Sequence, residues 1–169
     1  IDAATIGIIT PAGTVDNSGT ITAVVAGANL GGGDFTNSGD IQVTDSAGIG
    51  VIGSGVTMDN TGSLTSAGEG VQLSGSSILT NSGSISAELA GVTLATGTSI
   101  DNTGSITSTT GAAIVATGGA TITNRGSLTG SGDAILLSGG ENILTLGSDS
   151  SISGAIRSVF SGAPDDSLV

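Results

Sequence analysis

The sequence predicts a parallel β-helix, an all-β solenoid in which short strands wind around one axis. Three observations predict this fold: a motif that returns about every 21 residues, apolar residues at alternating positions around it, and a composition poor in helix formers. The chain has 169 residues, among them 31 Gly, and it lacks Trp, Tyr, His, Cys and Lys. We expect residues 1–169 to form a single β-helix segment of about seven coils, with three strands in each coil and no separate catalytic domain.

The repeated motif first occurs as DNSGTIT at residues 16–22 and returns five times, with an Asn and, two places later, a Gly in every copy. Asn tolerates left-handed backbone at a bend, and its amide can bond to the same group on the coils above and below. Gly suits either a positive φ or a close approach of two backbones. We interpret these residues as a structural ladder at a bend: Asn17, Gly19, Asn37, Gly39, Asn60, Gly62, Asn81, Gly83, Asn102, Gly104, Asn124 and Gly126.

Apolar residues predict three strands in each coil, because side chains at alternate positions of a strand face the same side. One set lies two residues before the Asn: Val15, Phe35, Met58, Leu79, Ile100 and Ile122. A second set lies four residues after it: Ile21, Ile41, Leu64, Ile85, Ile106 and Leu128. The third set is Ile49 with Val51, Val71 with Leu73, Val92 with Leu94, Ala113 with Val115, and Ile135 with Leu137.

A degenerate seventh copy of the motif follows the sixth. In it we expect Leu146, Ser148, Ser150 and Ile152 to take the places of the first apolar residue, the Asn, the Gly and the second apolar residue. Seven coils at the strand spacing of about 4.8 Å make a rod of roughly 34 Å.

The residue before each Asn alternates strictly between aspartate and threonine: Asp16, Thr36, Asp59, Thr80, Asp101 and Thr123. An outward aspartate on every coil would place carboxylates about 5 Å apart, where like charges destabilise a sheet. Threonine in between widens the separation to about 10 Å, near one Debye length at 0.1 M salt. We expect each threonine to hydrogen-bond the flanking carboxylates, and Arg125 to pair with Asp101 on the neighbouring coil.

Composition excludes several classes of function. The formal charge of −12 argues against nucleic-acid binding and against attachment to an anionic membrane, and no apolar run is long enough for direct membrane insertion. Without His or Cys, His-based catalysis, Cys nucleophiles and the usual zinc sites cannot be built. We expect no catalytic residue, no cofactor and no metal; calcium, which accepts oxygen ligands, is the only metal that the acidic bends suit.

The segment TNRGSLTGSGDAILLSGGENILTLGSDSSISGAI (123–156) resembles the repeats of classical autotransporter passengers, the secreted β-helical part of type V secretion proteins of Gram-negative bacteria. GAPDDSLV (162–169) is similar to the next such coil. Two-partner secreted haemagglutinin-like surface proteins have similar repeats. The resemblance implies a right-handed helix, export through an outer-membrane barrel, and display or release at the surface of a Gram-negative cell. The pattern is carried by Asn124, Gly126, Leu128, Gly130, Gly132, Ala134, Ile135, Gly139, Gly140, Asn142, Leu144, Leu146, Gly147, Ser148, Ile152 and Gly154.

The function that we expect is structural: a rod or stalk of a secreted or surface-displayed bacterial adhesin, whose host or cell-surface ligand the residues do not name. The bend-rich stretch 23–35 is the best place for a recognition loop. Neither Ile1 nor Val169 lies in a capping segment, so we expect a fragment of a longer passenger, whose ends contact neighbouring coils of the same chain or of identical copies. If the ends contact identical copies, the chain is the subunit of a filament that stacks head to tail. Rows of Ser and Thr beside the second apolar set leave ice binding or glycan binding as further alternatives.

Overall fold

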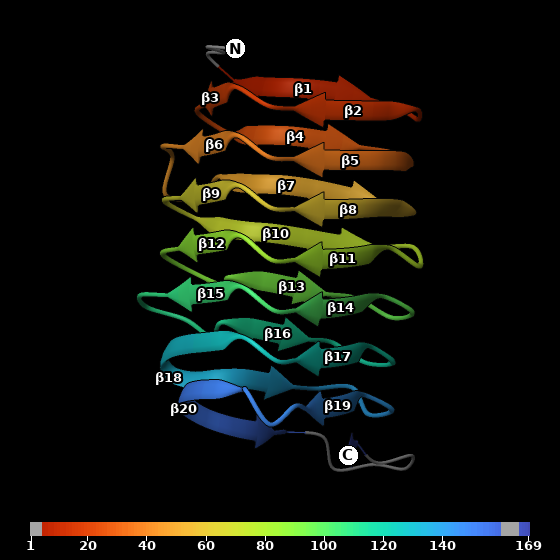
Figure 1. Ribbon diagram of the computed structural model, residues 1–169, viewed down its shortest axis with the longest axis vertical. Coiled ribbons are helices and arrows are strands. Elements are labelled where there is room, and N and C mark those ends of the chain that lie inside the picture. The colour runs from red at the N-terminus through yellow and green to blue at the C-terminus, as the bar shows by residue number, and fades with distance from the viewer. Residues whose placement is uncertain (1–4, 160–165) are drawn as a thin grey trace.

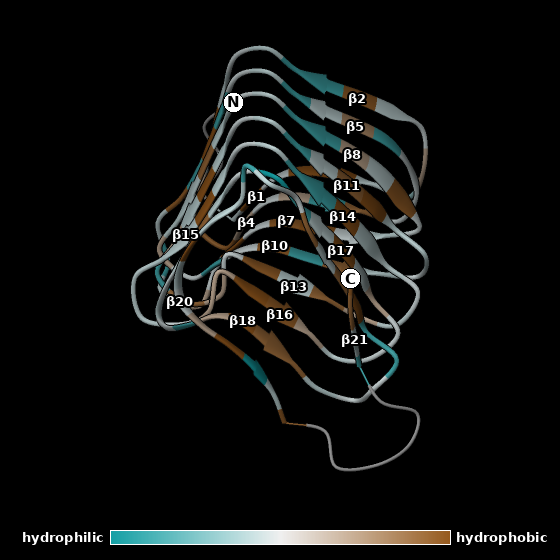
Figure 2. Ribbon diagram, turned by 60° about the horizontal axis from the view of Figure 1, so that its bottom comes forward, coloured by the Kyte–Doolittle hydropathy of each residue, from teal (hydrophilic) through white to brown (hydrophobic). Residues whose placement is uncertain are grey.

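The computed structural model describes residues 5–159 and 166–169, and the predicted fold is confirmed: it is a parallel β-solenoid of about seven turns (Figure 1). Three strands make up each turn, and each pairs in parallel with the equivalent strand of the next turn. The strands therefore form three rows along the axis, which we call the β1, β2 and β3 faces. In Figures 1 and 2 the chain passes behind along β1 and returns in front along β2 as it descends, which makes the coil right-handed.

The β1 face contains β1 (Ile6–Thr10), β4 (Ala26–Leu30), β7 (Ile49–Ser54), β10 (Glu69–Ser74), β13 (Val92–Leu94) and β16 (Ile114–Ala116). The β2 face contains β2 (Thr14–Asn17), β5 (Gly33–Asn37), β8 (Val56–Asn60), β11 (Ile78–Asn81), β14 (Ser99–Asn102), β17 (Thr121–Asn124), β19 (Ile143–Leu146) and β21 (Ser167–Leu168). The β3 face contains β3 (Thr20–Ala23), β6 (Asp40–Val43), β9 (Ser63–Ser66), β12 (Ser84–Ala87) and β15 (Ser105–Ser108). Two long strands, β18 (Ser127–Leu137) and β20 (Ser151–Ser158), pair with each other and run from the β3 face onto the β1 face.

Stacked apolar side chains fill the interior, because the register repeats from coil to coil. Ile21 pairs with Ile41, and the column continues through the rest of the second predicted set to Leu128 and Ile152. The first predicted set forms an equivalent column on the β2 face, with Leu144 added after Ile122. From Phe35 to Ile122 and from Ile21 to Leu128, both columns are almost fully buried. In Figure 2 the three strand rows enclose this interior.

The third predicted set is partly wrong. Val51 pairs with Val71, so Ile49 lies opposite Glu69 and Gly53 takes the place that Leu73 has one coil later. Further along, Val92 pairs with Ile114 rather than with Ala113. Unequal bends cause both errors. Five residues connect β6 to β7 and another five connect β15 to β16, whereas only two connect β9 to β10. Residues at a fixed distance from the motif Asn therefore do not lie opposite one another in neighbouring coils on the β1 face.

The recognition loop predicted at residues 23–35 is also wrong, because most of that segment is strand. It contains β4 and the beginning of β5, and Ala26, Ala28 and Leu30 are buried in the core. Gly27 is needed there because a Cβ on it would lie 2.5 Å from Cγ2 of Ile41 and 2.6 Å from the carbonyl oxygen of Gly50. The small residues that suggested a loop instead fit a narrow corner of the solenoid.

Among the described residues, no helix has the length and the apolar character needed to cross a membrane.

Candidate functional site

The six asparagines of the motif lie in one continuous stack at the corner between the β2 and β3 faces. Asn17 Nδ2 donates to Asn37 Oδ1 at 2.7 Å, and the same bond at the same distance links each later pair as far as Asn124. All of them are fully buried except Asn17, which is 8% exposed. Because each inner amide both donates to one coil and accepts from the other, the stack satisfies polar groups that would be costly to bury alone.

Backbone bonds reinforce the same corner. From Asn17 to Asn102, the carbonyl oxygen of each Asn accepts from both amides of the next two-residue bend; for Asn60, the donors are the amides of Ser82 and Gly83, at 2.9 and 3.0 Å. The carbonyl oxygen of Gly62 then accepts from the amide of Ser84 at 2.9 Å. Side-chain and main-chain bonds thus fix the spacing of successive coils at one point of the cross-section.

The motif positions require glycine because the backbones of neighbouring coils approach closely there, and not because the backbone has a positive φ. None of the six has a positive φ. A Cβ on Gly83 would lie 2.1 Å from the carbonyl oxygen of Gly62, and Gly39, Gly62, Gly104 and Gly126 have the same contact at 2.0–2.1 Å with the preceding coil. Gly19, on the first coil, has no atom within 4 Å of that position. The structure therefore decides between the two reasons for glycine that the sequence left open.

The ladder stops after Asn124, and the predicted seventh copy is wrong in two of its four places, those of Leu146 and Ser148. Leu144 lies opposite Ile122, and Leu146 lies opposite Asn124, where the next asparagine would be. Ile152 has its predicted place, opposite Leu128, and Ser150 has the place of the glycine, because it directly precedes Ser151 as Gly126 precedes Ser127. The reason is an insertion: two residues separate Asn124 from β18, but four separate Leu146 from β20. The Ser150 hydroxyl in this longer bend donates to the carbonyl oxygen of Asn124 at 2.6 Å.

A second buried polar column, which the sequence analysis missed, lies at the entry to the β2 face. Ser77 Oγ accepts from the amide of Val56 at 3.1 Å, and Asn142 Oδ1 accepts from the amide of Ala120 at 3.2 Å. In the last coil Asp166 accepts from the amide and the Nδ2 of Asn142, and from the Ser158 hydroxyl. Burial raises the pKa of Asp166, but the three hydrogen bonds outweigh it and lower the pKa overall. This column was not predicted from the sequence, because the residue type at the equivalent position differs from coil to coil.

The alternating aspartates and threonines lie in one outward row of the β2 face, in the predicted order. In the neighbouring row Thr14 pairs with Asp34, and Asp34 pairs with Thr57. The carboxylates of Asp16, Asp34 and Asp59 therefore zigzag between two rows and never face each other on adjacent coils. The predicted bonds from threonine are wrong: among the described residues, Thr36, Thr80 and Thr123 donate no hydrogen bond to these aspartates.

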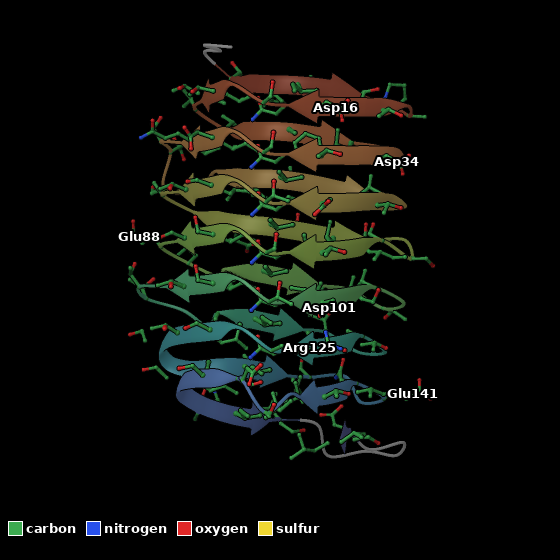
Figure 3. All side chains as sticks on the ribbon, in the orientation of Figure 1. Asp16, Asp34, Glu88, Asp101, Arg125 and Glu141 are labelled. Atoms are coloured by element: carbon green, nitrogen blue, oxygen red, sulfur yellow. The ribbon has the colours of Figure 1, made fainter. Side chains whose placement is uncertain are left out.

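Both arginines form ion pairs with an aspartate 24 residues earlier. Arg125 Nη1 contacts both carboxylate oxygens of Asp101, at 2.7 and 2.9 Å, which confirms the predicted pair (Figure 3). The second pair, between Arg157 and Asp133, was not predicted from the sequence, because Asp133 lies at a register shift inside the continuous strand β18. Hydrogen bonding to Arg157 lowers the pKa of Asp133 below its ordinary value of 3.8. All the other acidic side chains of the described part lack a cationic partner.

The β3 face presents rows of hydroxyl groups. From β9 onward its outward residues are uncharged: Ser63, Thr65, Ser84, Ser86, Ser105, Thr107, Ser127, Thr129, Ser151 and Ser153. Asp40 and Gln42 interrupt the pattern on β6. A shallow groove of about 430 Å³ crosses these strands and is lined by Gln42, Thr65, Ser86 and Glu88 among others. The ice-binding and glycan-binding alternatives depend on these rows.

Within residues 5–159 and 166–169, no group of three or more acidic side chains lies close enough together to hold a metal ion. Comparisons of the chain with protein-family models, with curated proteins and with solved structures find no match.

Replacing Asn81 by leucine should lower the stability of the solenoid. The change leaves Asn60 Nδ2 and Asn102 Oδ1 without their ladder partners, and two buried unpaired groups together cost roughly 2–6 kcal/mol. Thermal unfolding followed by circular dichroism measures the effect. Asn17→Leu is the control, because it removes one ladder bond at the end of the stack, and it should cost about half as much. Equal melting of Asn81→Leu and the wild type would contradict the ladder.

A methyl group at the motif glycine should be tolerated on the first coil only. Gly83→Ala forces its Cβ against the carbonyl oxygen of Gly62 and should cost about 1–3 kcal/mol, as overpacking does. Gly19→Ala has open space and serves as the matched control. Urea unfolding of both variants checks this, and similar losses at the two positions would refute the close-approach explanation.

Thr80→Asp should destabilise the rod more at low salt than at high salt. The new carboxylate would lie between Asp59 and Asp101 on the adjacent coils, and exposed charges at that spacing are screened by salt. Thr65→Asp is the matched control, because its neighbours across the coils are Gln42 and Ser86. The test is the melting temperature at two salt concentrations, and a salt response equal to that of the control would exclude charge spacing as the cause.

Proposed function

We propose that the chain is a non-catalytic rod segment of a secreted or surface-displayed bacterial adhesin. The observation that carries the proposal is the constant register of the motif from coil to coil, held by the asparagine ladder from Asn17 to Asn124. A solenoid of this kind has hydrogen bonds running along its axis on three faces, so bending it in any direction would stretch the bonds on the convex side. Such a segment is suited to hold a binding surface away from a cell.

The absence of His and Cys from the sequence supports a structural role, because the commonest general base and the commonest thiol nucleophile are missing. The uncompensated negative charge suits a protein that stays soluble outside the cell. Type V secretion as the route to the surface is proposed from the resemblance of residues 123–156 to autotransporter passenger repeats.

The test removes two complete coils, residues 61–102, which joins Asn60 to Thr103 in the same register as Asn60 to Thr61. If the chain is a spacer, the shortened protein should fold with the same β spectrum, be about 10 Å shorter by small-angle X-ray scattering, and still be labelled by antibody on intact cells. If these two coils carry a specific binding site, the shortened protein would lose binding to that ligand. Labelling that requires permeabilised cells would contradict surface display.

A further inference from the structure

The groove on the β3 face lies where one bend is shorter than its neighbours. The bend between β9 and β10 has two residues, whereas the equivalent bends before and after it have five and four. Ala67 in the short bend is half-buried, while Thr44, Glu88 and Thr109 in the adjacent bends are exposed, and all four line the groove. Figure 3 shows Glu88 projecting outward beyond β12. The short bend therefore forms the floor of a notch between longer ones.

A second hollow, of about 230 Å³, continues the groove toward the first coil. Its lining includes Asp40 and Ser63, and Gln42 and Thr65 line both hollows. The second hollow forms because long side chains on β6 lie opposite short ones on β9: Asp40 pairs with Ser63, and Gln42 pairs with Thr65. From β3 to the bend after β15 the two hollows cross four strand spacings, or roughly 19 Å along the axis. The combined groove is elongated.

Polar groups in the groove are free to bind a ligand. Among the described residues, the side chains of Gln42, Thr65 and Ser86 form no hydrogen bond within the protein, and neither does the carboxylate of Glu88. The first three lie side by side on β6, β9 and β12. Amide and hydroxyl groups both donate and accept, and the methyl group of Ala67 lies beside them. Convergent polar groups around a small apolar surface are typical of small-molecule sites.

Charge and topology narrow the class of ligand. Asp40 and Glu88 line the groove without a cationic partner, and both arginines pair with aspartates outside it, so an anionic ligand would be repelled. A peptide strand cannot extend the sheet at this place, because β6, β9 and β12 are already paired on both edges. Uncharged hydroxyl groups, which donate and accept as the lining groups do, match what remains.

We propose that the groove binds a neutral oligosaccharide of hexopyranose units, which lies along the rod axis across β6, β9 and β12. Gln42, Thr65 and Ser86 hydrogen-bond its hydroxyl groups. The chain has no Trp or Tyr to stack on a sugar ring, so hydrogen bonds hold the ligand and the Kd is on the order of millimolar. The inference goes beyond the proposed function and does not depend on it, because a groove on the side of a rod leaves the stacking of the coils unchanged.

The experiment is an NMR titration of the full, isotopically labelled chain with three hexasaccharides. Maltohexaose and cellohexaose are neutral, hyaluronan hexasaccharide is anionic, and each is added to about 10 mM, above a millimolar Kd. Both neutral probes should shift the amide signals of β6, β9, β12 and the bends that follow them, and the anionic probe should not. Ser86→Leu removes a hydroxyl and fills the groove, and it should weaken binding at least about tenfold. Gln42→Ala should weaken it about two- to tenfold.

Ser127→Leu is the matched control, because Ser127 is also a half-buried outward serine of the β3 face but lies two coils away, outside the groove. It should bind like the wild type, and circular dichroism should verify that all three variants fold. No shift with either neutral probe would overturn the proposal, as would tighter binding of the anionic probe or equal weakening by Ser86→Leu and Ser127→Leu. Excision of residues 61–102 should abolish binding even where surface display persists, so that each proposal can fail separately.

Discussion

The bond from one asparagine amide to the next is the interaction on which the rest of the structure depends. It occurs at the corner between the β2 and β3 faces, where the connection is two residues long in each of the first six coils. Between β1 and β19 the connections at the other two corners vary in length from one to five residues, apart from the corner that the continuous strand β18 spans. Bends of such different lengths can be accommodated because the asparagine corner restores the register once in each of these six coils. The glycine beside it allows the backbones of neighbouring coils to come as close as the amide bond requires.

A fixed coil spacing also decides what the outer surface can carry. Every outward residue has a neighbour one strand spacing away, about 4.8 Å, on each side. Carboxylates are tolerated under that constraint when they alternate with threonine and zigzag between rows, as Asp16, Asp34 and Asp59 do. The two cations lie where they pair with an acid of the preceding coil. The distribution of charge thus follows from the same repeat that builds the core.

Much of the fold could be predicted from the sequence because its strongest signals are local and repeat. The asparagine, the glycine and the two apolar residues around them lie at fixed offsets within one short motif, so their columns were predicted correctly for six coils. The third column was not, since a bend of variable length separates it from the motif, as at Val51 and Ile114. Leu146 was misplaced because an insertion follows it. The polar column of Ser77, Asn142 and Asp166 could not be found, because different residue types make the equivalent hydrogen bonds in different coils.

Hydrogen exchange of the asparagine side-chain amides, followed by NMR, tests the central claim most directly. The chain contains its own reference in Asn29, which lies in the outward row of the β1 face, outside the ladder. If the ladder pins the coils, the Nδ2 protons of Asn37, Asn60, Asn81 and Asn102 should exchange at least about a hundredfold more slowly than those of Asn29, because opening them requires coils to separate. Exchange of the ladder amides at the rate of Asn29 would contradict the account.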